Sequence, residues 1–188
     1  MAPIHFTSAV FVDSLFVKQT IQEARETYPN LEEQDISLDA IMSRIIEYTG
    51  FENYHVFYFE IPAEHLKPNL NLASMGKTKK IHGKSVKFQL VEADLIAPEM
   101  ADFFIQNQSR FAHTVLVADD IIYSTWIGES GNYPNLTVFR RREPETRMLW
   151  DFYDRYAYFE DLILEICKEI PRSNHQNQPA SCFRKTAF

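Results

Sequence analysis

The chain contains several short segments in which apolar residues alternate with polar ones or run together, a pattern typical of β-strands. These segments are rich in β-branched and aromatic residues, which favour strands. They are IHFTSAVFV at 4–12, YHVFYFEI at 54–61, SVKFQLVE at 85–92, HTVLVA at 113–118, IIYSTWI at 121–127 and LTVFRR at 136–141. The nearly continuous run at 54–61 predicts a buried central strand, and the last three segments predict a meander.

Other segments repeat their apolar residues every three or four positions, which predicts four helices. Asp13 or Ser14 can cap the first helix and Ser37 the second, and Gly50 is placed to end the second helix in the left-handed conformation. The predicted helices run over 14–28, 37–49, 98–110 and 144–170. The sequence therefore predicts an α+β fold, with a mixed sheet of about six strands flanked by about four helices.

Length and composition predict one folded domain. Of the 188 residues, 45% are hydrophobic, with 15 Phe and 9 Tyr, which is enough apolar area for a core. We expect this domain at 1–172 and a flexible, polar tail at 173–188, while 62–85 shows no steady period and is expected to be a loop. The predicted core residues are Phe57, Phe59, Phe88, Leu90, Val115, Val117, Trp126, Phe152, Phe159 and Ile163.

The net charge, and the absence of membrane-spanning and secretory signals, exclude some classes of protein. The net charge is −7, from 19 basic and 26 acidic residues, which argues against a dedicated binder of nucleic acid or of an anionic membrane. The sequence has no apolar run long enough to span a membrane and no secretory signal pattern, so a cytoplasmic location is expected. Because neither the two cysteines nor the six histidines have metal-ligand spacing, we expect no metal and no other cofactor.

One set of polar residues around a predicted strand indicates phosphoryl chemistry. His113 is followed seven residues later by Asp120, and Ser130 and Asn132 come after the next apolar segment. This order resembles the HxKxxxxD motif and the GSxN-like turn of the phospholipase D superfamily, and the order of the predicted helices and strands is similar to it as well. The resemblance implies that His113 is a nucleophile on phosphorus, with Asp120 as its orienting carboxylate and Ser130 and Asn132 in the phosphate pocket.

The residue at the lysine position of this motif decides between two functions. Val115 stands there, and a neutral apolar group cannot neutralise charge on a phosphoryl oxygen. The leading hypothesis is therefore a catalytically inactive, phospholipase-D-like interaction or regulatory module. The alternative is an active phosphodiesterase or nuclease, which would have to dimerise and borrow a cation. Without any such function, His113 simply starts a strand, and Asp119 and Asp120 form a hairpin turn.

A second candidate site is a run of lysines without an acid between them. Lys77, Lys79, Lys80, Lys84 and Lys87 place a local charge of +5 in the stretch that is expected to be a loop. Such a patch attracts phosphate-bearing ligands. The alternative is a solvated surface without a ligand.

A third candidate lies on the first predicted strand. The segment IHFTS, with His5, resembles the histidine-bearing strand of ADP-ribosyltransferases, and Glu60 is a conceivable distant acid. That function requires His5 and Glu60 to face one open cleft, whereas the alternative is a structural, hydrogen-bonded histidine.

The partner expected from the sequence is a protein. The predicted last helix carries eight acidic and three basic residues between Glu143 and Glu169, a charge that could dock a basic partner. Three consecutive arginines, Arg140 to Arg142, end a predicted strand beside acidic residues. We expect them to form surface ion pairs, with the middle arginine on the opposite face from the other two.

Overall fold

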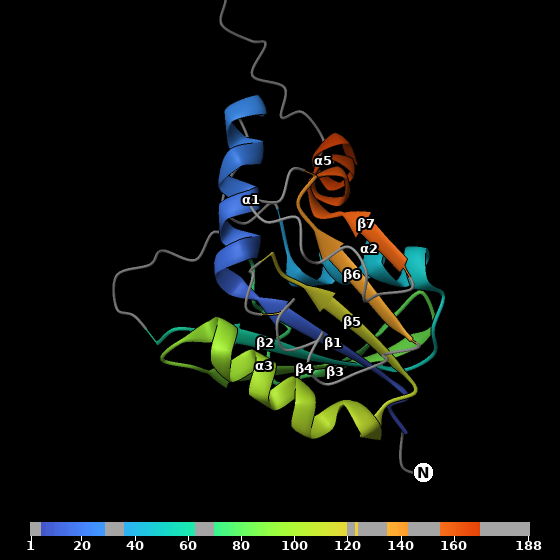
Figure 1. Ribbon diagram of the computed structural model, residues 1–188. Coiled ribbons are helices and arrows are strands. Elements are labelled where there is room, and N and C mark those ends of the chain that lie inside the picture. The colour runs from blue at the N-terminus through green and yellow to red at the C-terminus, as the bar shows by residue number, and fades with distance from the viewer. Residues whose placement is uncertain are drawn as a thin grey trace, which may run out of the picture.

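A seven-stranded mixed sheet organises the chain (Figure 1). The computed structural model describes residues 5–28, 36–62, 70–119, 123, 135–142 and 155–169. The strands are β1 (Ser8–Asp13), β2 (Tyr54–Glu60), β3 (Thr78–Ile81), β4 (Lys84–Glu92), β5 (His113–Val117), β6 (Leu136–Arg140) and β7 (Arg155–Tyr158). Their order across the sheet is β3-β4-β2-β1-β5-β6-β7. All neighbouring strands pair in parallel except β3 and β4, which form an antiparallel hairpin.

Helices cover both faces of this sheet. They are α1 (Ser14–Thr27), α2 (Leu38–Thr49), α3 (Ile96–Asn107), which continues into a 3₁₀ turn (Gln108–Arg110), and α5 (Phe159–Glu169). Figure 1 shows α1, α2 and α5 on one side of the sheet and α3 on the other. The described part of the chain thus confirms the predicted α+β class, with a mixed sheet and four helices.

The helix ends agree with the predicted capping residues. The Asp13 side chain accepts hydrogen bonds from the backbone N–H groups of Leu15 and Phe16, at the start of α1. The Ser37 hydroxyl accepts one from the Ala40 N–H at the start of α2. Gly50 ends α2 with φ of 67°, in the left-handed region that glycine adopts without strain.

The core consists of two apolar clusters, one on each face of the sheet. One contains the buried side chains of α1, α2 and α5, and the other those of α3. Seven of the predicted core residues are at most 4% exposed: Phe57, Phe59, Phe88, Val115, Val117, Phe159 and Ile163. The prediction is wrong for Leu90, which is 42% exposed and lies in the carboxyl half of β4, beyond the residues that pair with β3. Trp126 and Phe152 lie outside the described residues.

Two predicted elements differ from the structure because strand pairing overrides the local pattern. The long helix predicted over 144–170 is wrong at Arg155–Tyr158, which pairs with β6 as a strand before α5 begins. The predicted meander is also wrong, since β5 and β6 pair directly with each other and leave no place between them for a strand at 121–127. Of the strand predicted at 121–127, only Tyr123 is described, and its side chain is buried.

The stretch expected to be a loop holds the β3–β4 hairpin. Its turn is made by His82 and Gly83, which have φ of 48° and 77°, as a two-residue hairpin turn requires. Lysines occupy many positions of this hairpin, so the pattern of apolar residues is too weak to predict it. Among the described residues, no helix combines the length and the apolar composition needed to cross a bilayer.

Substituting Gly50 tests the left-handed end of α2. A Cβ at this position would contact nothing within 4 Å, so backbone strain alone should set the cost of Gly50→Ala. We expect this variant to lose about 1 kcal/mol of the free energy of unfolding. Gly50→Asn should lose less, because asparagine tolerates the left-handed region. Equal stability of the alanine variant and the wild type in urea denaturation would contradict the expectation.

Candidate functional site

The strand order directs attention to one edge of the sheet. From β1 the chain goes to β2 and β4 on one side and later returns to β5, β6 and β7 on the other. The six parallel strands thus follow the order of doubly wound sheets, with the reversal between β1 and β5. In such sheets ligands bind outside the carboxyl ends of the strands at the reversal, because the connecting loops diverge there.

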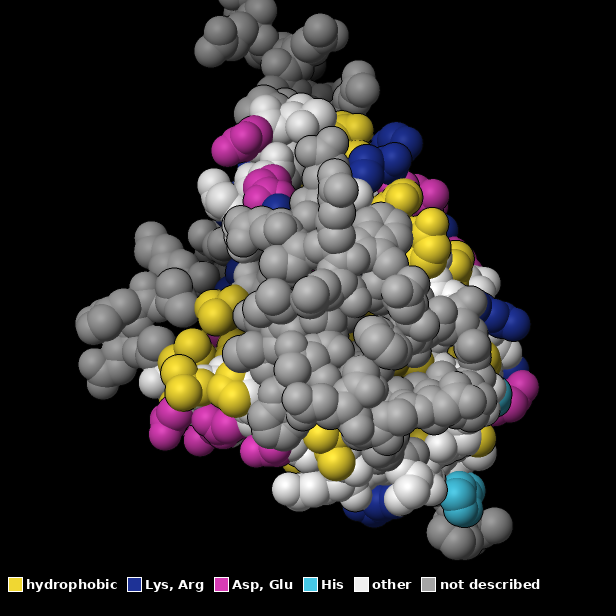
Figure 2. Space-filling view, viewed as in Figure 1, with side chains coloured by type: hydrophobic (Ala, Val, Ile, Leu, Met, Phe, Trp, Pro, Cys, Tyr) yellow, Lys and Arg dark blue, Asp and Glu magenta, His cyan; other side chains and the backbone are white. Residues whose placement is uncertain are grey.

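Acidic residues lie at or just after the ends of four neighbouring strands at this edge. Asp13 ends β1, Glu60 ends β2 and Glu92 ends β4, while Asp119 follows the end of β5 by two residues. Figure 2 shows further acidic side chains gathered beside hydrophobic ones near the start of α3, where Leu95 is exposed. Negative charge of this kind attracts cations to the carboxyl edge.

Asp13 is the most tightly held of these residues. It is 6% exposed, its Oδ1 accepts the N–H groups of Leu15 and Phe16 at 2.9 and 3.2 Å, and its Oδ2 accepts the Tyr123 hydroxyl at 3.1 Å. The positive end of the α1 dipole stabilises its charge. A carboxylate therefore occupies the first amides of α1, where a doubly wound dinucleotide site would hold its phosphates next to a glycine-rich turn.

Asp119 lies close to Asp13 through the register of β1 and β5. Val12 is opposite Val117, so the next residue, Asp13, is level with Ala118 and one position short of Asp119. Neighbouring strands are about 5 Å apart. The Asp119 side chain is 7% exposed. The backbones at Asp13 and Asp119 thus lie side by side at the reversal point.

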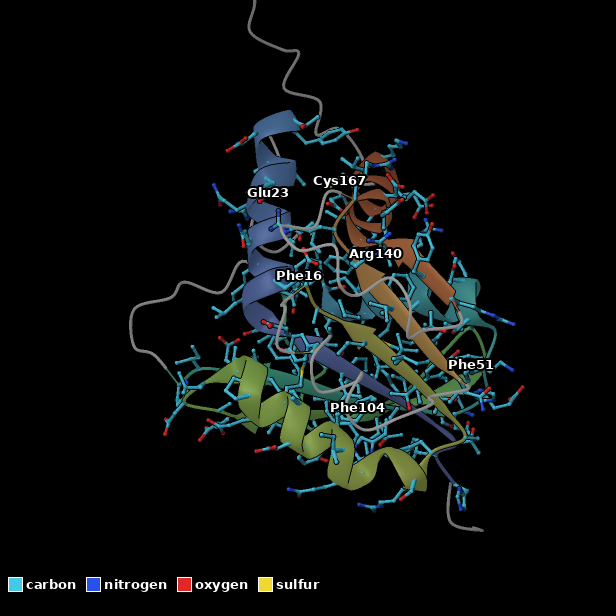
Figure 3. The ribbon with its side chains drawn as sticks, viewed as in Figure 1. Phe16, Glu23, Phe51, Phe104, Arg140 and Cys167 are labelled. Atoms are coloured by element: carbon cyan, nitrogen blue, oxygen red, sulfur yellow. The ribbon has the colours of Figure 1, made fainter. Side chains whose placement is uncertain are left out.

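Two basic residues pair with acidic residues of this edge. The Lys18 Nζ lies 2.5 Å from Glu60 Oε1. Arg141, which follows β6, places its Nε 3.7 Å from Asp119 Oδ2 and donates from Nη1 to both oxygens of Glu23, at 2.9 and 3.0 Å. Figure 3 labels Glu23 on α1, above Phe16. The edge therefore combines acidic and basic groups.

Two buried hydroxyls adjoin the Lys18–Glu60 pair. Ser14 and Tyr58 are both 0% exposed, and their oxygens have no hydrogen bond of normal geometry in the described structure. Burial, together with the neighbouring Glu60 carboxylate, raises the pKa of Tyr58 far above its ordinary value. The Tyr58 phenol therefore stays protonated at neutral pH and can only donate or accept hydrogen bonds, without acting as a base.

The carboxyl edge does not form a conventional metal cage. No group of three or more His, Cys, Asp or Glu side chains is arranged to hold a metal ion among the described residues. A Mg²⁺ ion needs less than this, since proteins commonly bind it through one or two carboxylates while water and substrate phosphates complete its shell. Asp13 and Asp119 provide two carboxylates at this edge.

The structure places His113 at the opposite, amino edge of the sheet. Its ring stacks on Phe51 with centroids 4.1 Å apart and planes 9° from parallel, and Figure 3 shows Phe51 at this edge. Val115 is fully buried. From His113 to Asp119, β5 advances six residues, or about 20 Å. The other residues of the predicted site, Asp120, Ser130 and Asn132, lie outside the described residues.

The structure also separates the two residues of the transferase hypothesis. His5 precedes β1 at the amino edge, where its backbone carbonyl accepts a hydrogen bond from Asn53. Glu60 ends β2 at the carboxyl edge and is paired with Lys18. Since Ser8 is level with Tyr54, the strand from there to Glu60 spans about 20 Å. The structure does not bring the two side chains to one cleft.

The five lysines of the predicted anion site lie on or next to the β3–β4 hairpin, and several have partners. Lys79 is paired with Asp39 and Lys84 with Glu52. Lys77 and Lys80 donate to the carbonyls of Ala73 and Gly83, at 2.7 and 3.2 Å. Lys87 lies across from His55 on β2. These contacts reduce the free positive charge of the patch.

The three consecutive arginines divide as alternation predicts, but not all are at the surface. Arg140 is 0% exposed and lies over the rings of Tyr156 and Tyr158, so a surface ion pair is wrong for this residue. Arg142 lies over Tyr158 and pairs with Asp161 on α5, while Arg141 points the other way, toward α1. Burial of Arg140 depends on the β6–β7 pairing, which the sequence pattern does not predict.

The sequence predicts other roles for the residues of the carboxyl edge and does not indicate a common site. Asp13 is a predicted helix cap, Asp119 belongs to the acidic pair of a predicted turn, and Arg141 belongs to the arginine run. The sequence pattern that the two aspartates share is an acidic residue at or just after the end of a buried strand, repeated on neighbouring strands. It becomes informative only when the strand order is known.

The comparisons with known proteins leave this site as the main guide to function. The sequence matches no protein-family profile, no curated protein and no solved structure significantly.

His55, on β2, is the described histidine with the strongest electrostatic perturbation. Its ring lies 4.0 Å from that of Phe57 and 5.6 Å from that of Phe6, and its Nε2 is 2.9 Å from Gln89 Oε1. Burial, and then the charge of Lys87, lower its pKa from 6.5 to about 4. The folded protein therefore holds His55 neutral under conditions that protonate it in the unfolded chain.

His55 should make the free energy of unfolding depend on pH. Its contribution is complete above pH 6.5 and is lost as the pH falls toward 4, because the unfolded chain binds a proton that the folded chain does not. Urea denaturation between these pH values should show a smaller decline for His55→Gln than for the wild type. The exposed His5 provides the control, as His5→Gln should decline like the wild type. An unchanged slope in His55→Gln would refute the assignment.

Proposed function

We propose that this chain hydrolyses phosphodiester bonds with a divalent cation bound between Asp13 and Asp119. The observation that carries the proposal is the pair of buried carboxylates on adjacent parallel strands, at the point where the strand order reverses. Doubly wound sheets bind their ligands at this point, and two carboxylates are sufficient protein ligands for Mg²⁺ when a phosphate supplies further oxygens.

The surrounding groups are consistent with this chemistry. A divalent cation supplies Lewis-acid chemistry and neutralises charge on the phosphoryl oxygens. In the hydrolysis a water oxygen forms a bond to phosphorus, the bond from phosphorus to the leaving oxygen breaks, and a water proton ends on the leaving alcohol. Arg141 beside Asp119 provides a positive group for the phosphate, and the first amides of α1 hold the Asp13 carboxylate in a fixed position.

The proposal keeps one reaction class predicted from the sequence and moves it to other residues. The phosphodiesterase or nuclease with His113 as nucleophile would work at the amino edge of β5 and without a metal. The present proposal works at the carboxyl edge, through Asp13 and Asp119, and requires a metal. The two versions therefore differ in their dependence on chelator and on His113.

A non-catalytic interaction module is the second candidate. The observation that favours it is that both carboxylates already have protein partners: Asp13 caps α1 and accepts from Tyr123, and Asp119 is paired with Arg141. In that case these contacts stabilise the strand ends, and the carboxyl edge binds no cation.

Cleavage assays with matched variants separate these possibilities. We expect the purified chain to cleave bis-p-nitrophenyl phosphate, and single-stranded DNA or RNA, with Mg²⁺ or Mn²⁺ but not with excess EDTA. Asp13→Asn and Asp119→Asn should each lower the rate by about a hundredfold, because each removes a charge from the metal site. Asparagine is itself a good helix cap, so Asp13→Asn should leave the fold intact.

Two further variants complete the experiment. Asp102→Asn removes the same charge from the exposed side of α3, away from the residues proposed to bind the ion, and should cleave like the wild type. His113→Ala should also remain active. Cleavage that persists in EDTA and disappears in His113→Ala would instead favour the histidine nucleophile, and a complete lack of cleavage with either metal would favour the interaction module.

A further inference from the structure

Arg141 has one donor that the described protein does not satisfy. Its Nη1 donates to Glu23 and its Nε faces Asp119, but its Nη2 is buried and has no hydrogen-bond partner among the described residues. A buried guanidinium nitrogen without an acceptor is costly, and a native protein normally provides an acceptor. An oxygen of a bound ligand would satisfy this donor.

The guanidinium group is held rigidly toward the carboxyl edge. Both oxygens of Glu23 bind the same nitrogen, the Cζ lies 5.8 Å from the centre of the Phe16 ring, and the side chain is 20% exposed. These contacts come from α1, the helix that Asp13 caps, so the position of Arg141 is fixed relative to Asp13 as well as to Asp119. An arginine fixed in this way is suited to a planar, paired contact with phosphate oxygens.

We infer that Arg141 binds a non-bridging phosphate oxygen of the phosphodiester through Nη2, an inference that rests on the proposed function. The adjacent Asp119 holds the cation on one side of the phosphate while Arg141 holds an oxygen on the other. Glu23 is a positioning residue, because it acts only by orienting the guanidinium. The inference assigns the substrate-binding role to one arginine of three: Arg140 is fully buried against the rings of Tyr156 and Tyr158, and Arg142 is paired with Asp161 on α5.

The test compares two neighbouring arginines that carry the same charge. Arg141→Gln should weaken the binding of a fluorescein-labelled single-stranded oligonucleotide about tenfold or more, measured with Ca²⁺ in place of Mg²⁺ to prevent cleavage. Arg142→Gln removes an equal charge one residue away and should change the dissociation constant less than about twofold. Arg141→Lys should be intermediate, because it restores the charge without the planar donors.

The same variants are then assayed for cleavage of bis-p-nitrophenyl phosphate with Mg²⁺. We expect Arg141→Gln to raise KM more than it lowers kcat, and thermal melting should confirm that each variant is folded. If Arg141→Gln and Arg142→Gln behave alike in folded protein, the inference is overturned, even where the wild type cleaves. If the wild type binds the oligonucleotide through Arg141 but never cleaves, the inference holds and the proposed hydrolysis is overturned. Absence of both binding and cleavage in the wild type overturns both.

Discussion

The parallel pairing of β1 with both β2 and β5 is the constraint on which the rest of the structure depends. Every residue of β1 is buried, and its side chains alternate between the two core clusters. Parallel neighbours require long crossover connections, so helices are brought onto both faces and the carboxyl ends of the strands meet at a single edge. The row of acids at this edge, including Asp13 and Asp119, is a direct result of that pairing direction, because an antiparallel partner would send its end to the other edge.

Local signals in the sequence were sufficient to predict most of the fold. Asp13, Ser37 and Gly50 mark helix ends through hydrogen bonds and backbone conformations that involve only nearby residues. The continuous apolar run at β2 likewise indicates a strand buried on both faces. The errors are non-local: Arg155–Tyr158 has a helical spacing of apolar residues, yet it pairs with β6, and the parallel pairing of β5 with β6 leaves no local trace.

The candidate site was less predictable, for a related reason. His113 and Asp120 resemble a motif in one dimension, but β5 runs between His113 and Asp119 and separates them by the length of a strand. Asp13 and Asp119 are more than a hundred residues apart in sequence and become neighbours only through the register of β1 and β5. Arg141 depends in the same way on a helix that begins at residue 14. A site assembled at the ends of strands is therefore hidden until the strand order is known.

The lysine-rich hairpin also has a consequence for association between molecules. β3 stands at the end of the sheet, is four residues long, and has adjacent lysines, Lys79 and Lys80, in its middle. An open strand edge is a template for adding strands from another chain, and short, positively charged edge strands oppose this addition. The lysines of β3 therefore oppose edge-to-edge association of this sheet with strands of other molecules, whether or not they bind an anion.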